Sequence, residues 1–239
     1  MKYDRTLLLA VAVVASACNA APGRPTADSE VMAPNKIVSF DVLYASNCAG
    51  CHGANGSGGL ALRLADPVYL AIADDPTIRR VIADGVPGTA MPAFASTSGG
   101  MLTAEQIDAI VRGMRTRWAR AGELAGVEVP PYAASVAGDA QRGGDVYAQA
   151  CASCHGAAGH GGERASAIVD RSYLALVSDQ HLRTTVIAGR PELGAPDWRG
   201  NVNATPMSDK DVTDVVAWLV SHRVQSPGQP YPTSNGLQH

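Results

Sequence analysis

The sequence Cys48-Ala49-Gly50-Cys51-His52 recurs as Cys151-Ala152-Ser153-Cys154-His155, at an offset of 103 residues. The similarity continues on both sides of this motif. Upstream, Tyr44 corresponds to Tyr147 at the same offset. Downstream the offset grows to 104 and then 105, through the pairs Tyr69 and Tyr173, Asp75 and Asp179, Pro92 and Pro196, Phe94 and Trp198, and Ile107 and Val212. Self-similarity of this kind indicates a repeated structural unit, so the sequence predicts two copies of one domain.

The repeat also suggests where the domains begin and end. The stretch between the two copies contains Gly122, Gly126 and the pair Pro130-Pro131, which are typical of a linker. We expect a signal peptide at 1–17, a tether at 18–36, a first domain at 37–119, a linker at 120–138, a second domain at 139–223 and a flexible tail at 224–239.

The first 17 residues are typical of an export signal. Lys2 and Arg5 form a short basic start, and the apolar run that follows is too short to cross a bilayer. Two interpretations are open: an ordinary signal peptide cleaved after residue 17, or a lipoprotein signal that makes Cys18 the lipidated N-terminus. The second departs from the usual pattern, since Ala15 stands where such signals carry Leu. We favour it because an unpaired fifth cysteine in an exported protein needs an explanation, and we expect a periplasmic lipoprotein attached to the membrane.

The composition excludes several classes of protein. The formal net charge is -3 and no Lys/Arg cluster stands out, which argues against a nucleic-acid partner. Five cysteines in 239 residues are too few for a disulfide-dense scaffold. Aromatic residues make up only 5% of the chain, so either the domains are small or something other than side chains fills their middle.

Helical patterns recur at corresponding places in the two copies, and no strand pattern stands out. Thr103 and Ser208 are suitable N-caps, with Gln106 and Asp211 three residues later. The predicted fold class is all-α: two tandem domains, each a few short helices around one bound group. The expected helices are 39–47 and 139–150, 75–84 and 179–188, and 103–119 and 208–222.

The Cys-X-X-Cys-His motif is the attachment signature of c-type haem. The two thiols add to the two vinyl groups of the porphyrin, and the adjacent imidazole, of His52 or His155, points at the iron from the same face. A redox dithiol or half of a zinc site is the alternative reading of Cys-X-X-Cys. A zinc site would use both pairs together, whereas here each pair lies in its own copy with its own His. We therefore expect two covalently attached c-type haems, and the porphyrins would supply the missing apolar bulk.

With these motifs the sequence resembles class I cytochrome c in its two-domain, dihaem form, over residues 37–119 and 139–223. The resemblance implies that Cys48, Cys51 and His52 hold one haem and that Cys151, Cys154 and His155 hold the other. It also implies a sixth iron ligand, usually Met, from a Pro-rich loop before the last helix. In the first copy Met91, followed by Pro92, matches this pattern, and a His/Met iron has a raised reduction potential. Met101 is the local competitor, but it adjoins the helix cap and is expected to pack there.

The second copy departs from the family pattern. Ala195 stands in the slot of Met91, and alanine cannot ligate iron. Met207 is the next candidate, but it aligns with Leu102, one residue before the helix cap, where an apolar packing residue is expected. The alternatives left open are Met207, a donor from the other domain or from a partner protein, and an iron that is five-coordinate or water-bound. Weaker candidate donors are His160, His181, His222 and His239.

Other polar residues allow two interpretations each. Trp198 and Arg199, next to the slot, are expected either to pack on the haem edge or to hydrogen-bond its propionates, as in related cytochromes. Arg79 and Arg183 could bind propionates in the same way. The simpler interpretation is that each forms a surface ion pair with the acidic residue four positions before it. The partners in those pairs would be Asp75 and Asp179.

The resemblance implies electron transfer as the function. We expect a carrier of single electrons between respiratory partners. It would take them from a quinol-oxidising complex or a dehydrogenase and pass them to a terminal oxidase or a soluble cytochrome. The sequence shows no Ser/His/Asp or paired-acid constellation of its own, so no catalytic residue is assigned. The alternatives are a peroxidase-like haem enzyme with an open second haem, because of Ala195, and a structural subunit of a respiratory complex.

Overall fold

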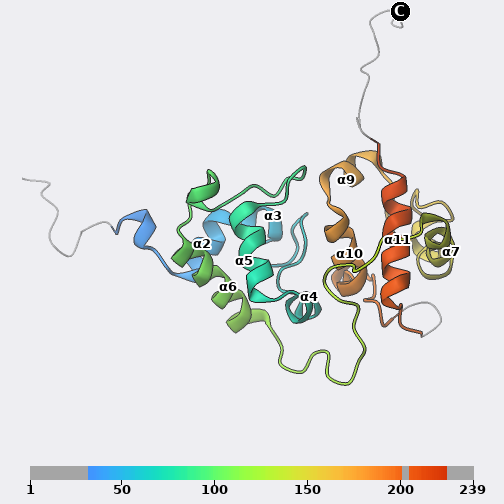
Figure 1. Cartoon of the computed structure of the whole chain (residues 1–239), viewed down its shortest axis with the longest axis horizontal. Coiled ribbons are helices and arrows are strands. Elements are labelled where there is room, and N and C mark those ends of the chain that lie inside the picture. The colour runs from blue at the N-terminus through green and yellow to red at the C-terminus, as the bar shows by residue number, and fades with distance from the viewer. Residues whose placement is uncertain (1–31, 201–204, 225–239) are drawn as a thin grey trace, which may run out of the picture. The chain divides into compact units, whose positions relative to one another are not determined.

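The computed structural model describes residues 32–200 and 205–224 of the chain, and within these ranges the protein is helical, with isolated β-bridges but no strand (Figure 1). Residues 1–37 form a unit of their own, described only around the short helix η3 (Pro34–Lys36). The remaining elements repeat in order. The first copy contains α2 (Phe40–Asn47), α3 (Ala49–His52), α4 (Pro67–Ile72), α5 (Asp75–Asp84), η4 (Ser96–Ser98) and α6 (Ala104–Trp118). The second contains α7 (Ala140–Ala150), α8 (Ala152–His155), α9 (Arg171–Leu176), α10 (Asp179–Ala188), η5 (Pro191–Leu193) and α11 (Asp209–Ser221).

The all-α prediction is confirmed, and the expected helices lie within one or two residues of the observed ones. The side chains of Thr103 and Ser208 each accept a hydrogen bond from the backbone N–H three residues later. The side-chain oxygens of Gln106 and Asp211 in turn accept one from the backbone N–H of Thr103 and Ser208. Both capping boxes are therefore present as expected.

Two α-helices longer than a single turn were not expected in the described chain. Both α4 and α9 are six residues long, too short to show an apolar period. Their N-caps were visible in the sequence, however. Asp66 accepts from the backbone N–H of Val68 and Tyr69 and is followed by Pro at the first helical position, while Asp170 accepts from Tyr173.

In each copy the first long helix crosses the last one at a glycine. In Figure 1, α2 lies against α6, and α7 lies against α11. A Cβ on Gly113 of α6 would lie 2.1 Å from the ring of Phe40 in α2. In the second copy the glycine is on the other helix: a Cβ on Gly143 of α7 would lie 2.0 Å from the carbonyl oxygen of Asp214 and 2.9 Å from Cβ of Trp218, both in α11.

The repeat shows that the two crossings use the same pair of positions, with the large side chain and the glycine exchanged between the helices. Phe40 corresponds to Gly143, and Gly113 corresponds to Trp218. If α2 crossed α11 in this geometry, Phe40 would meet Trp218, and if α7 crossed α6, two glycines would leave a gap. Overpacking costs about 1–3 kcal/mol, and a cavity the size of an aromatic ring costs at least as much. The exchange therefore favours pairing of the helices within each copy.

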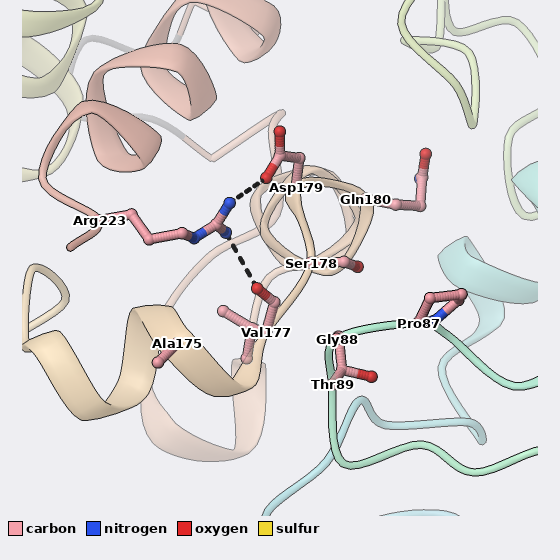
Figure 2. Close-up of a pocket in the computed structure, with 9 residues that line it drawn as sticks. All are labelled: Pro87, Gly88, Thr89, Ala175, Val177, Ser178, Asp179, Gln180 and Arg223. Carbon is pink, nitrogen blue, oxygen red and sulfur yellow. Dashed lines mark hydrogen bonds and ion pairs between the residues drawn. The ribbon is translucent and has the colours of Figure 1, made fainter. Parts of the chain in front are cut away.

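An arginine near the end of each copy binds the segment between the two middle helices. In the second copy Arg223 donates to the carbonyl oxygens of Leu174 and Val177, both at 2.9 Å. Its Nη1 also lies 2.6 Å from Asp179; Figure 2 shows the bonds to Val177 and Asp179. In the first copy Arg115 makes the corresponding set of contacts, with the carbonyls of Leu70 and Ala73 and the carboxylate of Asp75.

The expected ion pairs of Arg79 with Asp75 and of Arg183 with Asp179 are wrong. Arg79 instead lies 2.6 Å from Asp108 of α6. Arg183 is buried; it donates to the carbonyl of Pro131 in the linker and pairs with Asp209 of α11. Asp75 pairs with Arg115 instead, and Asp179 pairs with Arg223.

Asp214 is fully buried between α7 and α11. It accepts from the backbone N–H of Asp139 at 2.8 Å, from Arg142 at 2.5 Å and from Lys210 at 2.8 Å. Burial raises the pKa of this carboxyl, but the hydrogen bonds outweigh burial and lower the pKa from 3.8 to about 2. The ionised carboxylate thus ties the two helices together.

In the parts of the chain that the structure describes, no helix is long and apolar enough to cross a bilayer. The predicted signal peptide, Cys18, most of the tether and nearly all of the tail lie outside the described residues.

Replacing Gly143 with Ala is expected to lower the free energy of unfolding by about 1–3 kcal/mol, because the new methyl group meets backbone that cannot rotate away. Gly144→Ala, its neighbour in α7, is the matched control: its Cβ would come no closer than 3.3 Å to the Trp218 ring, and Ala favours the helix. Urea denaturation followed by far-UV circular dichroism measures both. Equal effects of the two changes would contradict the close crossing.

Asp214→Asn is expected to lower the free energy of unfolding at pH 7 by about 1.5–3 kcal/mol, the scale of hydrogen bonds to a charged group. Because the folded pKa lies below the unfolded one, this contribution is present above about pH 4 and is lost as the pH falls towards 2. Urea midpoints measured from pH 7 to pH 2 should therefore converge for variant and parent. Asp108→Asn, which removes a surface pair, should cost less than about 1 kcal/mol at every pH. A constant gap for Asp214→Asn would refute the assignment.

Candidate haem sites

Each Cys-X-X-Cys-His motif forms a single helical turn directly after the first long helix of its copy. Cys48 ends α2 by donating its N–H to the carbonyl of Tyr44 at 2.9 Å, and His52 donates its N–H to the carbonyl of Cys48 at 3.0 Å. The second copy repeats both bonds at the same lengths, from Cys151 and from His155. The structure therefore brings the two cysteines and the histidine of each motif together, as the sequence predicted.

Neither pair of motif cysteines is joined in a disulfide. Burial raises the pKa of the Cys48 thiol to about 11, with a contribution from Cys51, and the pKa of Cys151 is raised to about 11 for the same reason, with a contribution from Cys154. Reactive redox cysteines have a lowered pKa instead. Within residues 32–200 and 205–224, no group of three His, Cys, Asp or Glu side chains is arranged to hold a metal ion on its own, which also disfavours the zinc alternative.

Both motif histidines are held in the form that an iron ligand requires. Nδ1 of His52 lies 2.7 Å from the carbonyl oxygen of Leu62, and Nδ1 of His155 lies 2.8 Å from that of Ser166. A carbonyl only accepts, so Nδ1 carries the proton and Nε2 keeps its lone pair. Burial also lowers the pKa of His52, which favours the neutral ring.

A glycine turn follows each histidine and fixes the loop that supplies the carbonyl. Gly53 has φ +82° and Gly156 has φ +79°, and a Cβ on Gly53 would lie 1.8 Å from the carbonyl oxygen of Ser57. The hydroxyl of Tyr44 donates to the carbonyl of Gly53 at 2.9 Å, and Tyr147 binds Gly156 in the same way. The first helix, the motif and the turn are thus one connected structure in both copies.

The loop before the last helix places Met91 and Ala195 at corresponding positions. The N–H of Val86 donates to the carbonyl of Met91 at 3.0 Å, and the N–H of Arg190 donates to the carbonyl of Ala195 at 2.9 Å. Each loop starts with a glycine of positive φ, Gly85 or Gly189, against which the same part of the loop packs. The backbone therefore supports the sequence alignment: the second copy presents alanine where the first presents methionine.

Met207 lies at the position that Leu102 occupies in the first copy. The N–H of Met207 donates to the carbonyl of Trp198 at 2.9 Å, as that of Leu102 donates to Phe94 at 2.8 Å. Both side chains are buried in the core, with exposed fractions of 8% and 4%. Met101, by contrast, is 82% exposed.

The histidines outside the motifs lie in different surroundings. His160 is exposed, and His222 is held at the end of α11, with Nδ1 2.8 Å from the carbonyl of Trp218 and its ring against the indole. His181 is partly buried, and burial together with Arg190 lowers its pKa to about 4. His239 lies outside the described residues.

Two buried donors fit the carboxylates of a haem edge. Trp198 is 1% exposed, and its Nε1–H has no hydrogen-bond partner among the described residues, although buried indole N–H groups normally have one. Arg199 stacks on this indole, 4.8 Å from the ring, and pairs with Asp197 at 2.5 Å. In the first copy Nε of Arg63 is also buried and unpartnered, next to the Leu62 carbonyl that binds His52. Arg63 lies outside the motifs from which the site residues were predicted.

The chain matches the profile of the family described as cytochrome C oxidase, cbb3-type, subunit III, at residues 37–112 and again at 138–219. Each matched segment contains one Cys-X-X-Cys-His motif.

Curated relatives are similar over part of their length. The Cbb3-type cytochrome c oxidase subunit CcoP of Azospirillum sp. (strain B510) is 33% identical over 127 residues, covering 47% of this chain and 37% of that protein. The subunit FixP of Bradyrhizobium diazoefficiens is 27% identical over 171 residues, covering 67% of this chain and 54% of that protein. The chain thus spans about a third to a half of the curated relatives it matches.

Two solved structures are similar at a lower level. A chain of the reducing HAO-like protein complex of Kuenenia stuttgartiensis has a TM-score of 0.43 and 18% identity, covering 77% of this chain and 96% of that one. Thiosulfate dehydrogenase from Marichromatium purpuratum has a TM-score of 0.28 and 20% identity, covering 84% and 50%. Neither score is high enough to establish a shared fold.

Trp198→Phe is expected to lower the reduction potential of one haem and leave the other unchanged. Phenylalanine keeps an aromatic ring at this position but lacks the N–H that would donate a hydrogen bond to a propionate. Without this donor the propionate charge is less compensated and favours ferric iron. Phe94 is the corresponding residue of the first copy, so Phe94→Trp is the matched substitution in the opposite direction. Redox titration followed in the visible spectrum measures both potentials, and two unchanged potentials in Trp198→Phe would show that the indole N–H does not face a haem.

Proposed function

We propose that this chain, which belongs to the cbb3-type cytochrome c oxidase subunit III family, carries single electrons between respiratory partners by way of both of its haem domains. The chain is an all-α electron-transfer cytochrome with two covalently attached c-type haems. When bound, the haems supply one-electron redox chemistry; the protein positions them, tunes their potentials and excludes water.

The proposal assigns each haem to one motif. Cys48 and Cys51 would form the thioether bonds that hold the first haem, and His52 would ligate its iron; Cys151, Cys154 and His155 would do the same for the second. The observation that carries this assignment is the pair of Nδ1 contacts to the carbonyls of Leu62 and Ser166, which leave Nε2 of both histidines free for iron. Met91 is proposed as the sixth ligand of the first haem.

The proposed electron donors are a quinol-oxidising complex or a dehydrogenase, and the proposed acceptors are a terminal oxidase or a soluble cytochrome. Relatives of the chain are named as subunits of cbb3-type oxidases, which supports an oxidase as acceptor. The net charge of -3 suits docking on a basic protein surface and not on nucleic acid. We further propose the domain boundaries 37–119 and 139–223, and export to the periplasm as a lipoprotein attached through Cys18.

A second candidate function is favoured by one residue. Ala195 occupies the slot of the Met ligand, so the second haem is a candidate site for a small molecule, and a peroxidase-like enzyme would need such a site. The acids of this loop are paired with arginines, Glu192 with Arg190 and Asp197 with Arg199, so electron transfer is the function proposed.

Met91→His is expected to lower the reduction potential of one haem, because imidazole favours ferric iron more than a thioether does. The weak long-wavelength sulfur-to-iron absorption of the ferric protein should also disappear. Met101→Leu is the control: this neighbouring methionine is exposed, so neither property should change. Loss of the sulfur band in Met101→Leu, and not in Met91→His, would assign the ligand to Met101.

The carrier function is tested by mixing the reduced protein with a purified cbb3-type oxidase in a stopped-flow spectrometer. Both haems should be oxidised, at a rate that falls with rising ionic strength if docking is electrostatic. Reduced protein that stays reduced beside an active oxidase would remove the oxidase as acceptor.

A further inference from the structure

We infer that the second haem iron has no side-chain ligand opposite His155 and binds a small, uncharged molecule of the size of carbon monoxide or nitric oxide there. The inference rests on the proposed attachment of a haem to Cys151 and Cys154. It goes beyond electron transfer because it gives the chain a ligand-binding site.

The loop before the last helix has the same backbone hydrogen bond in both copies. The bond between Arg190 N–H and the carbonyl of Ala195 repeats that between Val86 and Met91, so the two copies present the same position. A methyl group cannot donate a lone pair to iron. Alanine is also three heavy atoms shorter than methionine, which leaves room for a diatomic molecule.

The residues after Ala195 also lack an available iron ligand. The sequence from Ala195 to Pro206 contains no Met, His, Cys or Lys. Met207 follows, but its backbone is bonded to Trp198 as that of Leu102 is bonded to Phe94, and its side chain fills the corresponding place in the core. The two copies therefore use this position for packing, and Met207 is no more available to the iron than Leu102 is.

The charged side chains of the loop are held in ion pairs. Nε of Arg190 lies 2.6 Å from Glu192, and Arg199 lies 2.5 Å from Asp197. Burial raises the pKa of Glu192, but the bond from Arg190 outweighs it and keeps the pKa below its usual value. Because both acids of the loop are held by arginines, the loop suits reversible binding of an uncharged ligand better than cleavage of a peroxide.

The test is carbon monoxide binding to the dithionite-reduced full-length protein, quantified in the visible spectrum and divided by the haem content measured as pyridine haemochrome. The expected result is two haems per chain and one carbon monoxide per chain. Met91→Ala should open the first site and raise binding to two per chain, which calibrates the signal. Ala195→Met should restore the missing ligand and abolish binding.

Met207→Leu is the discriminating control. This substitution gives the second copy the leucine that the first copy has at Leu102. Carbon monoxide binding should stay at one per chain. A parent protein with two haems that binds no carbon monoxide would overturn the open-site inference and leave the electron carrier intact. If Met207→Leu then binds carbon monoxide, Met207 is the ligand; if it does not, another donor is.

The haem count separates this failure from failure of the proposed function. A chain that carries fewer than two haems when expressed with its maturation system would refute the assignment of one haem to each motif. If Ala195→Met does not fold, the comparison of the parent with Met91→Ala and Met207→Leu still decides the outcome.

Discussion

The close crossing of the first and last helices is the constraint on which each copy depends. Between these helices the described chain runs through short helices and glycine turns, with no strand to hold them. Helices of six to ten residues are unstable alone in water, so they need the crossing pair as a frame. Phe40 against Gly113, and Gly143 against Trp218, let the two helix axes approach. The helical turn that carries the haem-attachment motif follows directly from that frame.

The two copies keep the frame and differ in what the distal loop offers. Tyr44 and Tyr147 anchor the same turn, and Gly85 and Gly189 start the same loop. On this shared backbone the side chain at the ligand slot changes from thioether to methyl. The two copies therefore differ in the side chain and not in the backbone, because the loop of the second copy keeps the same backbone hydrogen bond at Ala195.

Much of this organisation could be predicted from the sequence because it is local. The motif fixes the cysteines and histidine on one turn, and the capping boxes at Thr103 and Ser208 need only residues three apart. The features that could not be predicted from the sequence depend on tertiary packing. The arginine that binds Asp75 is Arg115, whereas Asp179 is bound by Arg223, which does not align with it, so no repeat offset could reveal the pairs. The exchange of Phe40 and Gly113 for Gly143 and Trp218 is visible only once both crossings are seen.

An open coordination position on the second iron would make electron transfer through this chain depend on the concentration of a small ligand. A carrier works best when its coordination is the same in both oxidation states, which Met91 would secure for the first haem. A ligand that binds ferrous iron more tightly than ferric iron raises the potential of the haem it binds, because binding and reduction are linked equilibria that favour each other by the same factor. The first haem would keep its potential while the second follows the ligand concentration. Electrons would then be held on the second haem when the ligand is present and released when it leaves, so a single substitution in a duplicated domain is enough to make electron flow ligand-dependent.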